Sequence, residues 1–237
     1  MTPVLELAAV SKDYRGLRPL RIQLLSVNAR DQIAILGFDQ PSAEVFVNLV
    51  TGATLPDQGT VAAFGRSTAD IAHSADWLAL VDRFGIVSER AVLLENLSVT
   101  QNLAVPFTLD IEPPSGDVLE RVASLAREVG LPESVWRVAV ATLGPDARAR
   151  IRLGRALALE PAILLLEHMS ATLDTGQASA FGASVRAIAE RRGVAVVAAT
   201  ADEVFANAVA SRVLALEPVT GRLRENGRRG WFGRRLG

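Results

Sequence analysis

Short apolar runs alternate with longer amphipathic stretches through the second half of the chain. The runs 163–166 and 194–199 contain no polar residue, which is typical of strands buried on both faces of a sheet. Stretches of helical length separate the runs, so the pattern predicts an α/β fold with a mostly parallel sheet and helices on both faces. The elements expected here are strands at 163–166, 194–199 and 212–217 and helices at 146–159, 178–191 and 203–210.

The first half begins with strands and then becomes helical. Apolar segments bounded by turn residues predict strands at 4–8, 20–28, 33–36, 61–64 and 83–88. These short segments, joined by tight turns, indicate a β part at the N-terminus.

The pattern turns helical between about 96 and 140. An amphipathic stretch at 99–107 is followed by a proline-containing break and by a helix that Asp117 opens and Gly130 ends. Because strands lie on both sides of this block, it is interpreted as an inserted subdomain. The expected plan is one domain, with a core at about 1–95 and 141–220, a helical subdomain at about 96–140 and a basic flexible tail at 221–237.

Residues 33–52 form the stretch around which the chain is organised. The apolar run leads through Gly37 and a short polar loop into an amphipathic stretch that ends at Thr51-Gly52. Strand, glycine-started loop and helix, in this order, are typical of a phosphate-binding loop. A plain strand–loop–helix of an α/β domain gives the same pattern, so both interpretations stay open here.

The chemistry of a phosphate-binding loop is missing from this stretch. In the pattern G-x-x-x-x-G-K-[ST], counted from Gly37, the last three positions are Ser42, Ala43 and Glu44. They lack the glycine for close approach, the lysine for the terminal phosphates and the hydroxyl for magnesium. Glu44 suits the positive N-terminus of a helix, where its carboxylate would repel a triphosphate.

No other residue is expected to restore the lost positive charge. Lys12 is the only lysine of the chain, and Arg30 and Arg66 lie in turns outside the loop. The two histidines and the carboxylates show no metal-ligand spacing, so no metal site is predicted, and His73 is interpreted as a surface residue.

Composition narrows the function classes further. The 237 residues carry a formal net charge of −1, which gives no argument for nucleic-acid binding, and the absence of cysteine excludes disulfides and thiolate catalysis. Neither a signal peptide nor an apolar run of membrane-spanning length is recognisable. A cytoplasmic protein that contacts membranes only through a partner is expected.

The arginine-rich segment 221–237 contains Trp231-Phe232. It is interpreted either as a flexible solvated tail or as an anchor for anionic lipid or an acidic protein surface.

Further motifs follow one another in a fixed order along the chain. They lie at 10–14, 55–61, 97–106, 155–166 and 173–174, and together they resemble the ATP-binding domain of ABC transporters over essentially the whole length. The motif at 97–106 is most similar to the lipoprotein-release and MacB-like subgroup. The resemblance implies a P-loop NTPase-like fold with an N-terminal antiparallel β part, a mostly parallel core and an inserted helical subdomain.

The resemblance also gives each position of the nucleotide site a role, and most are filled by another residue type. Tyr14 falls where an aromatic ring stacks on adenine, with packing as its alternative role. The magnesium carboxylate falls on Glu167, the catalytic base on His168, the switch histidine on Ala201 and the magnesium-sensing glutamine on Glu89. The nucleotide-binding-like positions are Tyr14, Gly37, Phe38, Asp39, Gln40, Pro41, Ser42, Ala43, Glu44 and Glu89.

The loop that would complete the site of a second subunit departs from its motif too. Pro145 removes a backbone donor, and Asp146 adds a negative charge where a partner's γ-phosphate would lie. In the family's "LD" motif, matched by Leu173-Asp174, the aspartate is expected either to contact a dimer partner or to cap a turn. The signature-like positions are Leu143, Gly144, Pro145, Asp146 and Ala147.

These departures predict a catalytically inactive member, a pseudo-ATPase, that binds ATP and Mg²⁺ weakly or not at all. Phosphoryl transfer depends on positioning and charge neutralisation, and loss of one stabilising group costs on the order of 100- to 1000-fold in rate. Glu167 as a weak metal ligand and His168 as a proton acceptor leave an unorthodox ATPase as a third hypothesis.

The leading hypothesis is a structural or regulatory subunit of a membrane ABC transporter complex at the inner face of the plasma membrane. The resemblance implies an ABC permease, a second ABC ATPase subunit, or both as partners, in a homo- or heterodimer, with Glu89 and 99–107 facing the permease. The alternative is a soluble adaptor that uses the fold as a scaffold for protein contacts.

Overall fold

The computed structural model describes residues 2–226 of the chain. The strands are β1 (Leu5–Lys12), β2 (Leu20–Val27), β3 (Gln32–Leu36), β4 (Gln58–Ala63), β5 (Arg66–Ser67), β6 (Phe84–Ser88), β7 (Ile163–Glu167), β8 (Ala195–Thr200), β9 (Arg212–Glu217) and β10 (Arg222–Glu225). The helices are α1 (Gln40–Val50), α2 (Ser74–Val81), α3 (Val99–Ala104), α4 (Gly116–Glu128), α5 (Pro145–Leu157), α6 (Thr175–Arg192) and α7 (Glu203–Val209), with 3-10 turns at Thr68–Asp70, Glu133–Val135 and Val140–Thr142.

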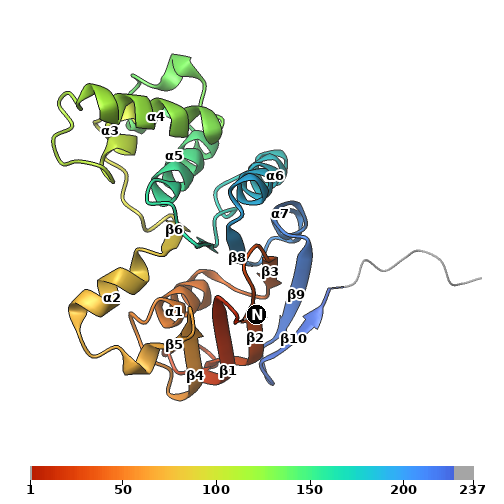
Figure 1. The fold of residues 1–237 in the computed structure, drawn as a ribbon. Helices are drawn as coiled ribbons and strands as arrows, with labels where there is room; N and C mark the ends of the chain where they lie inside the picture. Colours follow the sequence, from red (N-terminus) through yellow and green to blue (C-terminus); the bar gives the residue numbers. More distant parts are fainter. Residues whose placement is uncertain (1, 227–237) are drawn as a thin grey trace, which may run out of the picture.

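The strands form two sheets (Figure 1). A four-stranded antiparallel sheet has the order β2-β1-β4-β5, and a six-stranded sheet has the order β10-β9-β3-β8-β7-β6. Neighbours in the larger sheet are parallel except β10, which runs antiparallel to β9. The predicted α/β fold, with a mostly parallel core and an N-terminal antiparallel part, is confirmed.

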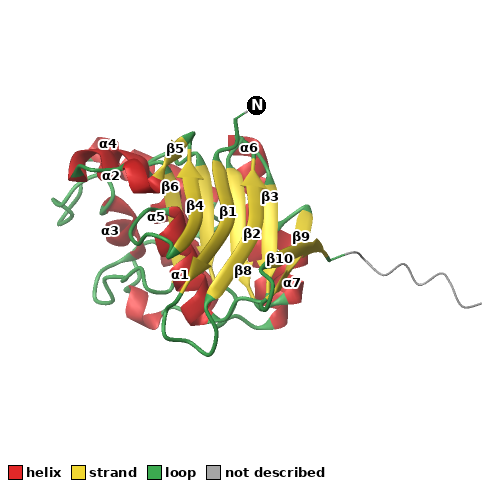
Figure 2. Cartoon of the chain, turned by 90° about the horizontal axis from the view of Figure 1, so that it is seen from below, coloured by secondary structure: helices red, strands yellow, loops and turns green. Residues whose placement is uncertain are grey.

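The parallel strands are mostly apolar because both faces of their sheet are covered, and buried polar residues such as Glu167 and Thr200 lie at the strand ends. In β7, Ile163 and Leu165 belong to the core between the two sheets and α1. Their neighbours Leu164 and Leu166 belong to a second core, formed with the helices on the opposite face. Because successive side chains of a strand point to opposite faces of the sheet, β7 contributes residues to both cores. Figure 2 shows the strands gathered in the middle of the molecule with the helices around them.

The helices α3, α4 and α5 pack together away from the antiparallel sheet (Figure 1). α5 packs against α3 and α4 and also against β6, so the helical group continues past the expected boundary at 140. α3 ends at Ala104, earlier than the expected 107, because Pro106 has no N–H with which to continue the helical hydrogen bonds. We call α3, α4 and α5, with the turns between them, the helical block.

Two segments differ from the expectations. Residues 222–225, assigned to a flexible tail, form β10: Gly221 adopts φ +74° and its N–H donates to the carbonyl of Glu217, which turns the chain back onto β9. The rest of that segment, 227–237 with Trp231-Phe232, lies outside the described residues. The polar stretch around His73 contains an unpredicted helix, α2, although His73 itself is exposed as expected.

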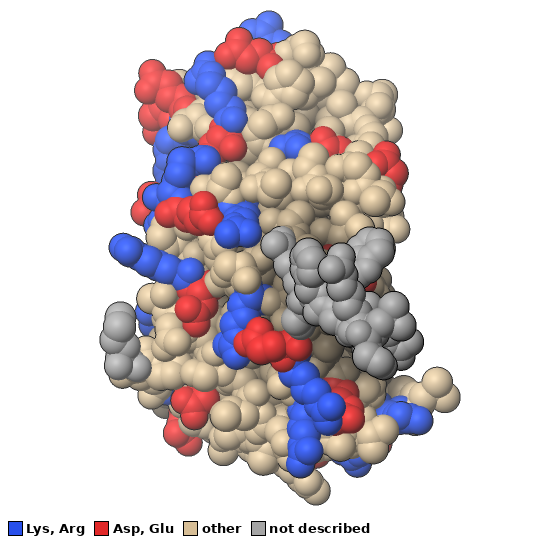
Figure 3. Space-filling view, turned by 90° about the vertical axis from the view of Figure 1, so that its right-hand side faces the viewer, with Lys and Arg blue, Asp and Glu red and all other residues tan. Residues whose placement is uncertain are grey.

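Charged side chains of both signs are interspersed on the face that carries β9 and β10 (Figure 3). Among residues 2–226, no helix has the length and apolarity needed to cross a lipid bilayer.

Candidate functional site

The expected phosphate loop is mostly helical. Only Gly37, Phe38 and Asp39 separate β3 from α1, which begins at Gln40. Asp39 is the N-cap, and its side chain accepts a hydrogen bond from the N–H of Ser42 at 2.9 Å while the Ser42 hydroxyl accepts from the N–H of Asp39 at 3.0 Å. Pro41 fits the first turn, where its missing donor costs nothing. The expectation for Glu44 is corrected: it lies in the second turn, and Asp39 is the carboxylate at the helix N-terminus.

The backbone N–H groups that a phosphate cradle would use are already bonded within the chain. Those of Gly37 and Phe38 donate to the carbonyl of Thr200 at 3.1 and 3.3 Å. Those of Asp39 and Ser42 are engaged in the cap, and the N–H that follows Ser42 donates to the Asp39 carbonyl at 2.9 Å. A phosphate group could enter this loop only if these bonds were broken.

The side chains at the ends of the loop are oriented by packing. Phe38 is fully buried, with its ring centroid 5.4 Å from that of Phe46, and Ala43 is buried in the same core. Tyr14 is half-buried against this core, which supports its packing role. A cavity of about 310 Å³ lies beside it, lined among others by Asp39 and Ser42.

The cavity carries charges of both signs, because Arg18 and Arg21 line it together with Asp39. Hydrogen bonds from the hydroxyl and the N–H of Ser42 lower the pKa of the Asp39 carboxyl, and the nearby His168 lowers it further. Burial and the negative charge of Asp39 raise the pKa of Tyr14. The carboxylate therefore stands where a nucleotide site would need positive charge.

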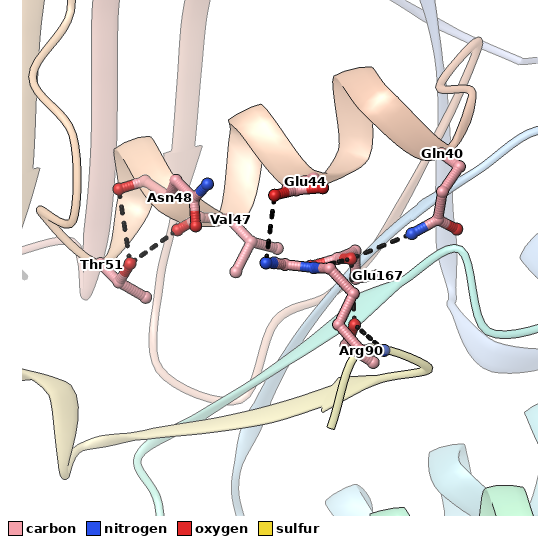
Figure 4. A network of polar contacts seen from close by, with 8 residues as sticks. Gln40, Glu44, Val47, Asn48, Thr51, Arg90 and Glu167 are labelled. Carbon is pink, nitrogen blue, oxygen red and sulfur yellow. Dashed lines mark hydrogen bonds and ion pairs between the residues drawn. The ribbon is translucent and has the colours of Figure 1, made fainter. Parts of the chain in front are cut away.

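An arginine occupies the other side of α1 (Figure 4). The Nε of Arg90 donates to Glu167 Oε1 at 2.7 Å, and a terminal nitrogen donates to Oε2 at 2.5 Å. The second terminal nitrogen contacts Glu44 Oε1 at 3.2 Å. The Glu167 side chain has no exposed surface, and it also accepts from Ser88 Oγ at 2.9 Å and from Gln40 Nε2 at 3.1 Å. These contacts raise the pKa of Arg90, chiefly through the hydrogen bonds to Glu167.

Strand register explains how Arg90 reaches Glu167. β6 and β7 are parallel neighbours in which Ser88 pairs with Glu167, the last residue of each strand. Arg90 follows two residues later, and its N–H donates to Ser88 Oγ at 3.1 Å, which turns it back over the strand end. Arg90 is thus a cation beside α1 that the sequence did not indicate, and its charge is paired with Glu167 and Glu44. The sequence could have indicated this contact only through the strands predicted at 83–88 and 163–166, if the two strands are assumed to be neighbours in the sheet.

His168 and Ala201 fill the positions of the family's catalytic base and switch histidine. His168 has φ +50°, its N–H donates to the carbonyl of Ala199 at 3.0 Å, and its Nδ1 is buried without a hydrogen-bond partner among residues 2–226. Ala201 is exposed between β8 and α7 and carries no group that transfers protons.

Glu89 contacts the segment before α6 rather than a cavity. Its carboxylate accepts from Thr172 Oγ1 at 2.5 Å. Asp174 is the N-cap of α6 and exchanges hydrogen bonds with Gln177, while Leu173 is half-buried beside it. The capping role considered for Asp174 thus has a structural basis.

The signature-like residues begin α5, in the helical block. Gly144 is the N-cap, Pro145 opens the helix, and Asp146 accepts from Arg150 Nε at 2.8 Å. Leu143 and Ala147 pack half-buried against the neighbouring core. The charge of Asp146 is thus partly compensated within its own helix.

Within the loop at α1, the structure brings together the positions Gly37 to Glu44, Arg90 and Glu167, with Tyr14 and His168 close to Asp39. The comparisons with known proteins agree with the family resemblance found in the sequence. The chain is 30% identical over 210 residues to the lipoprotein-releasing system ATP-binding protein LolD of Alcanivorax borkumensis, covering 86% of this chain and 91% of that protein. The chain belongs to the ATP-binding subunits of ABC transporters.

Other relatives are more distant or longer. The chain is 27% identical to the Fe(3+) ions import ATP-binding protein FbpC 2 of Pectobacterium atrosepticum and 26% identical to the methionine import ATP-binding protein MetN of Brucella abortus. The aligned regions span 94% and 91% of this chain but only 62% and 58% of FbpC 2 and MetN, respectively. No protein-family model matches the chain.

Solved structures share the fold. The chain superposes on cbiO1 of Clostridium perfringens, part of the ABC transporter complex cbiONQ, with a TM-score of 0.79 at 18% identity, covering 94% of this chain and 88% of that one. It superposes on the dimeric ATP-binding cassette MJ0796 bound to ADP and Pi with a TM-score of 0.75 at 22% identity, covering 96% and 100%.

Proposed function

We propose that this protein is a nucleotide-silent subunit of an ABC transporter complex, a pseudo-ATPase with a structural or regulatory role. The observation that carries this proposal is the first turn of α1. Residues that would form a phosphate cradle are helical, and their backbone donors are bonded to Asp39, Ser42 and Thr200.

Electrostatics favour the same conclusion. A triphosphate would meet the carboxylates of Asp39 and Glu44, and the guanidinium of Arg90, which contacts Glu44, is already paired with Glu167 as well. Preorganised positive charge is the main source of phosphoryl-transfer catalysis, so a site with this charge balance supports neither tight ATP binding nor hydrolysis. The unorthodox ATPase receives no support from His168, whose Nδ1 is buried beside Asp39.

Contact with a permease is the proposed route to the membrane, which places the protein at the cytoplasmic face. The LolD relative is named for a lipoprotein-releasing system, and the other relatives are named for import. Val92 and Leu94, in the segment between β6 and α3, are 75% and 39% exposed. Exposed apolar residues at this junction fit a protein contact. The transported substrate stays outside the proposal.

Thermal unfolding with and without Mg-ATP tests the silence of the site. A ligand at 100 times its Kd stabilises a protein by about 2.7 kcal/mol. For a domain of this size, that corresponds to a rise in Tm of roughly 5–11 °C. We expect no rise at millimolar Mg-ATP, with an intact ABC ATPase as positive control. A concentration-dependent rise would overturn the proposal.

Affinity purification from the source cells in mild detergent tests the role. Co-purification of a multi-span permease in stoichiometric amount, with or without a second ATP-binding subunit, is the expected result. Recovery of soluble proteins alone would favour the adaptor alternative.

A further inference from the structure

The segment 89–95 belongs to one of the two covalent links between the core sheet and the helical block, the other being the chain from α5 to β7. It leaves β6 at the edge of the six-stranded sheet and enters α3. Side chains from both parts form hydrogen bonds or ion pairs with this segment, which we call the connecting segment. How it is held decides whether the two parts can move relative to each other.

The helical block grips the connecting segment with arginines of α5. Arg152 donates to the carbonyls of Glu89 and Ala91 at 3.4 and 3.3 Å, and Arg155 donates to the carbonyl of Val92 at 2.7 Å. Burial lowers the pKa of both arginines. One turn earlier, Arg148 forms a two-pronged pair with Glu95 at 3.0 and 2.6 Å.

The core contacts the same segment through ion pairs and a hydrogen bond. Arg90 is paired with the fully buried Glu167 and with Glu44 of α1, and Thr172 holds the carboxylate of Glu89. Glu167 is compensated by this one arginine, so releasing Arg90 would leave a buried charge unpaired. The core-side contact is therefore costly to open, in contrast to an ordinary surface pair.

We infer that Arg90 is a latch that fixes the helical block against the core in a single arrangement without nucleotide. This inference rests on the proposed function and specifies how the site is used. The guanidinium of Arg90 lies between α1 and the end of β7. Through it, the rigid core restricts the motion of the connecting segment. The protein thus presents its partner with one constant geometry.

Distance measurements between the two parts test the latch. Because the chain contains no cysteine, two introduced cysteines can be labelled without background. Leu119→Cys on α4 and Val204→Cys on α7 are suitable, since these side chains are 39% and 42% exposed. Pulsed electron paramagnetic resonance of the spin-labelled pair then gives the distribution of distances between the helical block and the core.

The expected result is one narrow distribution for the labelled protein and a broadened or shifted one for Arg90→Ala. Arg90→Lys keeps the charge but loses the two-pronged contact. This variant should fold, and the width of its distance distribution should lie between those of the parent and Arg90→Ala. Arg66→Ala, which removes a surface pair with Asp76, is the matched control and should leave the distribution unchanged. An unchanged distribution in Arg90→Ala, or one as narrow as that of the parent in Arg90→Lys, would overturn the latch.

Adding Mg-ATP separates the latch from the proposed function. A shift of the parent distribution with Mg-ATP would refute nucleotide silence, whatever Arg90→Ala does. An unchanged Arg90→Ala distribution in the absence of nucleotide would refute the latch alone and leave nucleotide silence standing.

Discussion

Side chains at the positions of the family's nucleotide site form a polar network with one another around α1. The pair between Arg90 and Glu167 is the centre of this network, because Glu167 is completely buried whereas the Arg90 side chain is 41% exposed. Burying one carboxylate makes the network sensitive to the loss of its single cation, and this sensitivity can be measured.

Arg90→Ala should lower the free energy of unfolding by about 2–3 kcal/mol, as followed by urea denaturation. Breaking a fully buried ion pair costs roughly 3–5 kcal/mol, and the partial exposure of Arg90 reduces that value. Glu44→Gln, which removes only the exposed carboxylate, should cost less than about 1 kcal/mol. Combining Arg90→Met with Glu167→Met should cost less than Arg90→Ala alone. A larger loss in the double variant would show that the penalty does not come from the unpaired charge.

Asp39 should make stability depend on acidic pH. Hydrogen bonds from Ser42 lower its pKa in the folded protein, so its contribution is fully present above the unfolded pKa of about 3.9 and is lost as the pH falls through the folded pKa. Asp39→Asn keeps an N-cap side chain without the charge. The variant should be less stable than the parent at pH 7, and the difference should shrink as the pH falls below about 4. A constant difference across an acid titration would contradict this account.

At the residue scale, the sequence revealed the missing chemistry but not its replacement. Ser42, Ala43 and Glu44 can be counted from Gly37 along the chain. Arg90 and Glu167 are 77 positions apart, and their contact depends on β6 and β7 being parallel neighbours that end at the same edge. Charge pairs that depend on strand register have no local sequence pattern.

At the scale of elements, hydrophobic periodicity predicted most strands and helices because burial on two faces leaves an apolar run. It failed where polar residues fold for other reasons. α1 starts early because Asp39 and Ser42 cap it, and β10 forms from an arginine-rich stretch because Gly221 permits a tight turn back to β9. Caps and turns act through backbone geometry, which hydrophobicity does not report.

The register of β1 against β4 depends on one glycine. Gly59 has φ +82°, and a Cβ there would come within 2.3 and 2.4 Å of the carbonyl oxygens of Ala9 and Ala8. Gly59→Ala should therefore lower the free energy of unfolding by about 1–3 kcal/mol. Gly116→Ala is the matched control: it opens α4, has no atom within 4 Å of the added methyl group, and should stabilise by about 0.4–1 kcal/mol. Equal effects of both substitutions would exclude the backbone explanation.

At the scale of the whole molecule, the proposed silence of the nucleotide site also bears on assembly. ATP-binding subunits of this family pair head to tail, with nucleotide between the phosphate loop of one subunit and the signature loop of the other. Here those two surfaces carry Asp39 and Glu44 on one side and Asp146 on the other. If nucleotide silence holds as proposed, these carboxylates would disfavour phosphate between two copies, and nucleotide would not join them.

Association of this protein should therefore be independent of ATP. Light scattering coupled to size exclusion should give the same mass with and without millimolar Mg-ATP, whether the protein is a monomer or already paired. If the bonded first turn of α1 is enough to exclude nucleotide, Asp39→Asn with Glu44→Gln should still show no ATP-dependent change, because the backbone donors of the loop stay bonded to Thr200 and within the cap of α1. An ATP-dependent dimer of the parent would refute nucleotide silence. A dimer only in the neutral variant would show that the two carboxylates, and not the helical first turn of α1, keep nucleotide out.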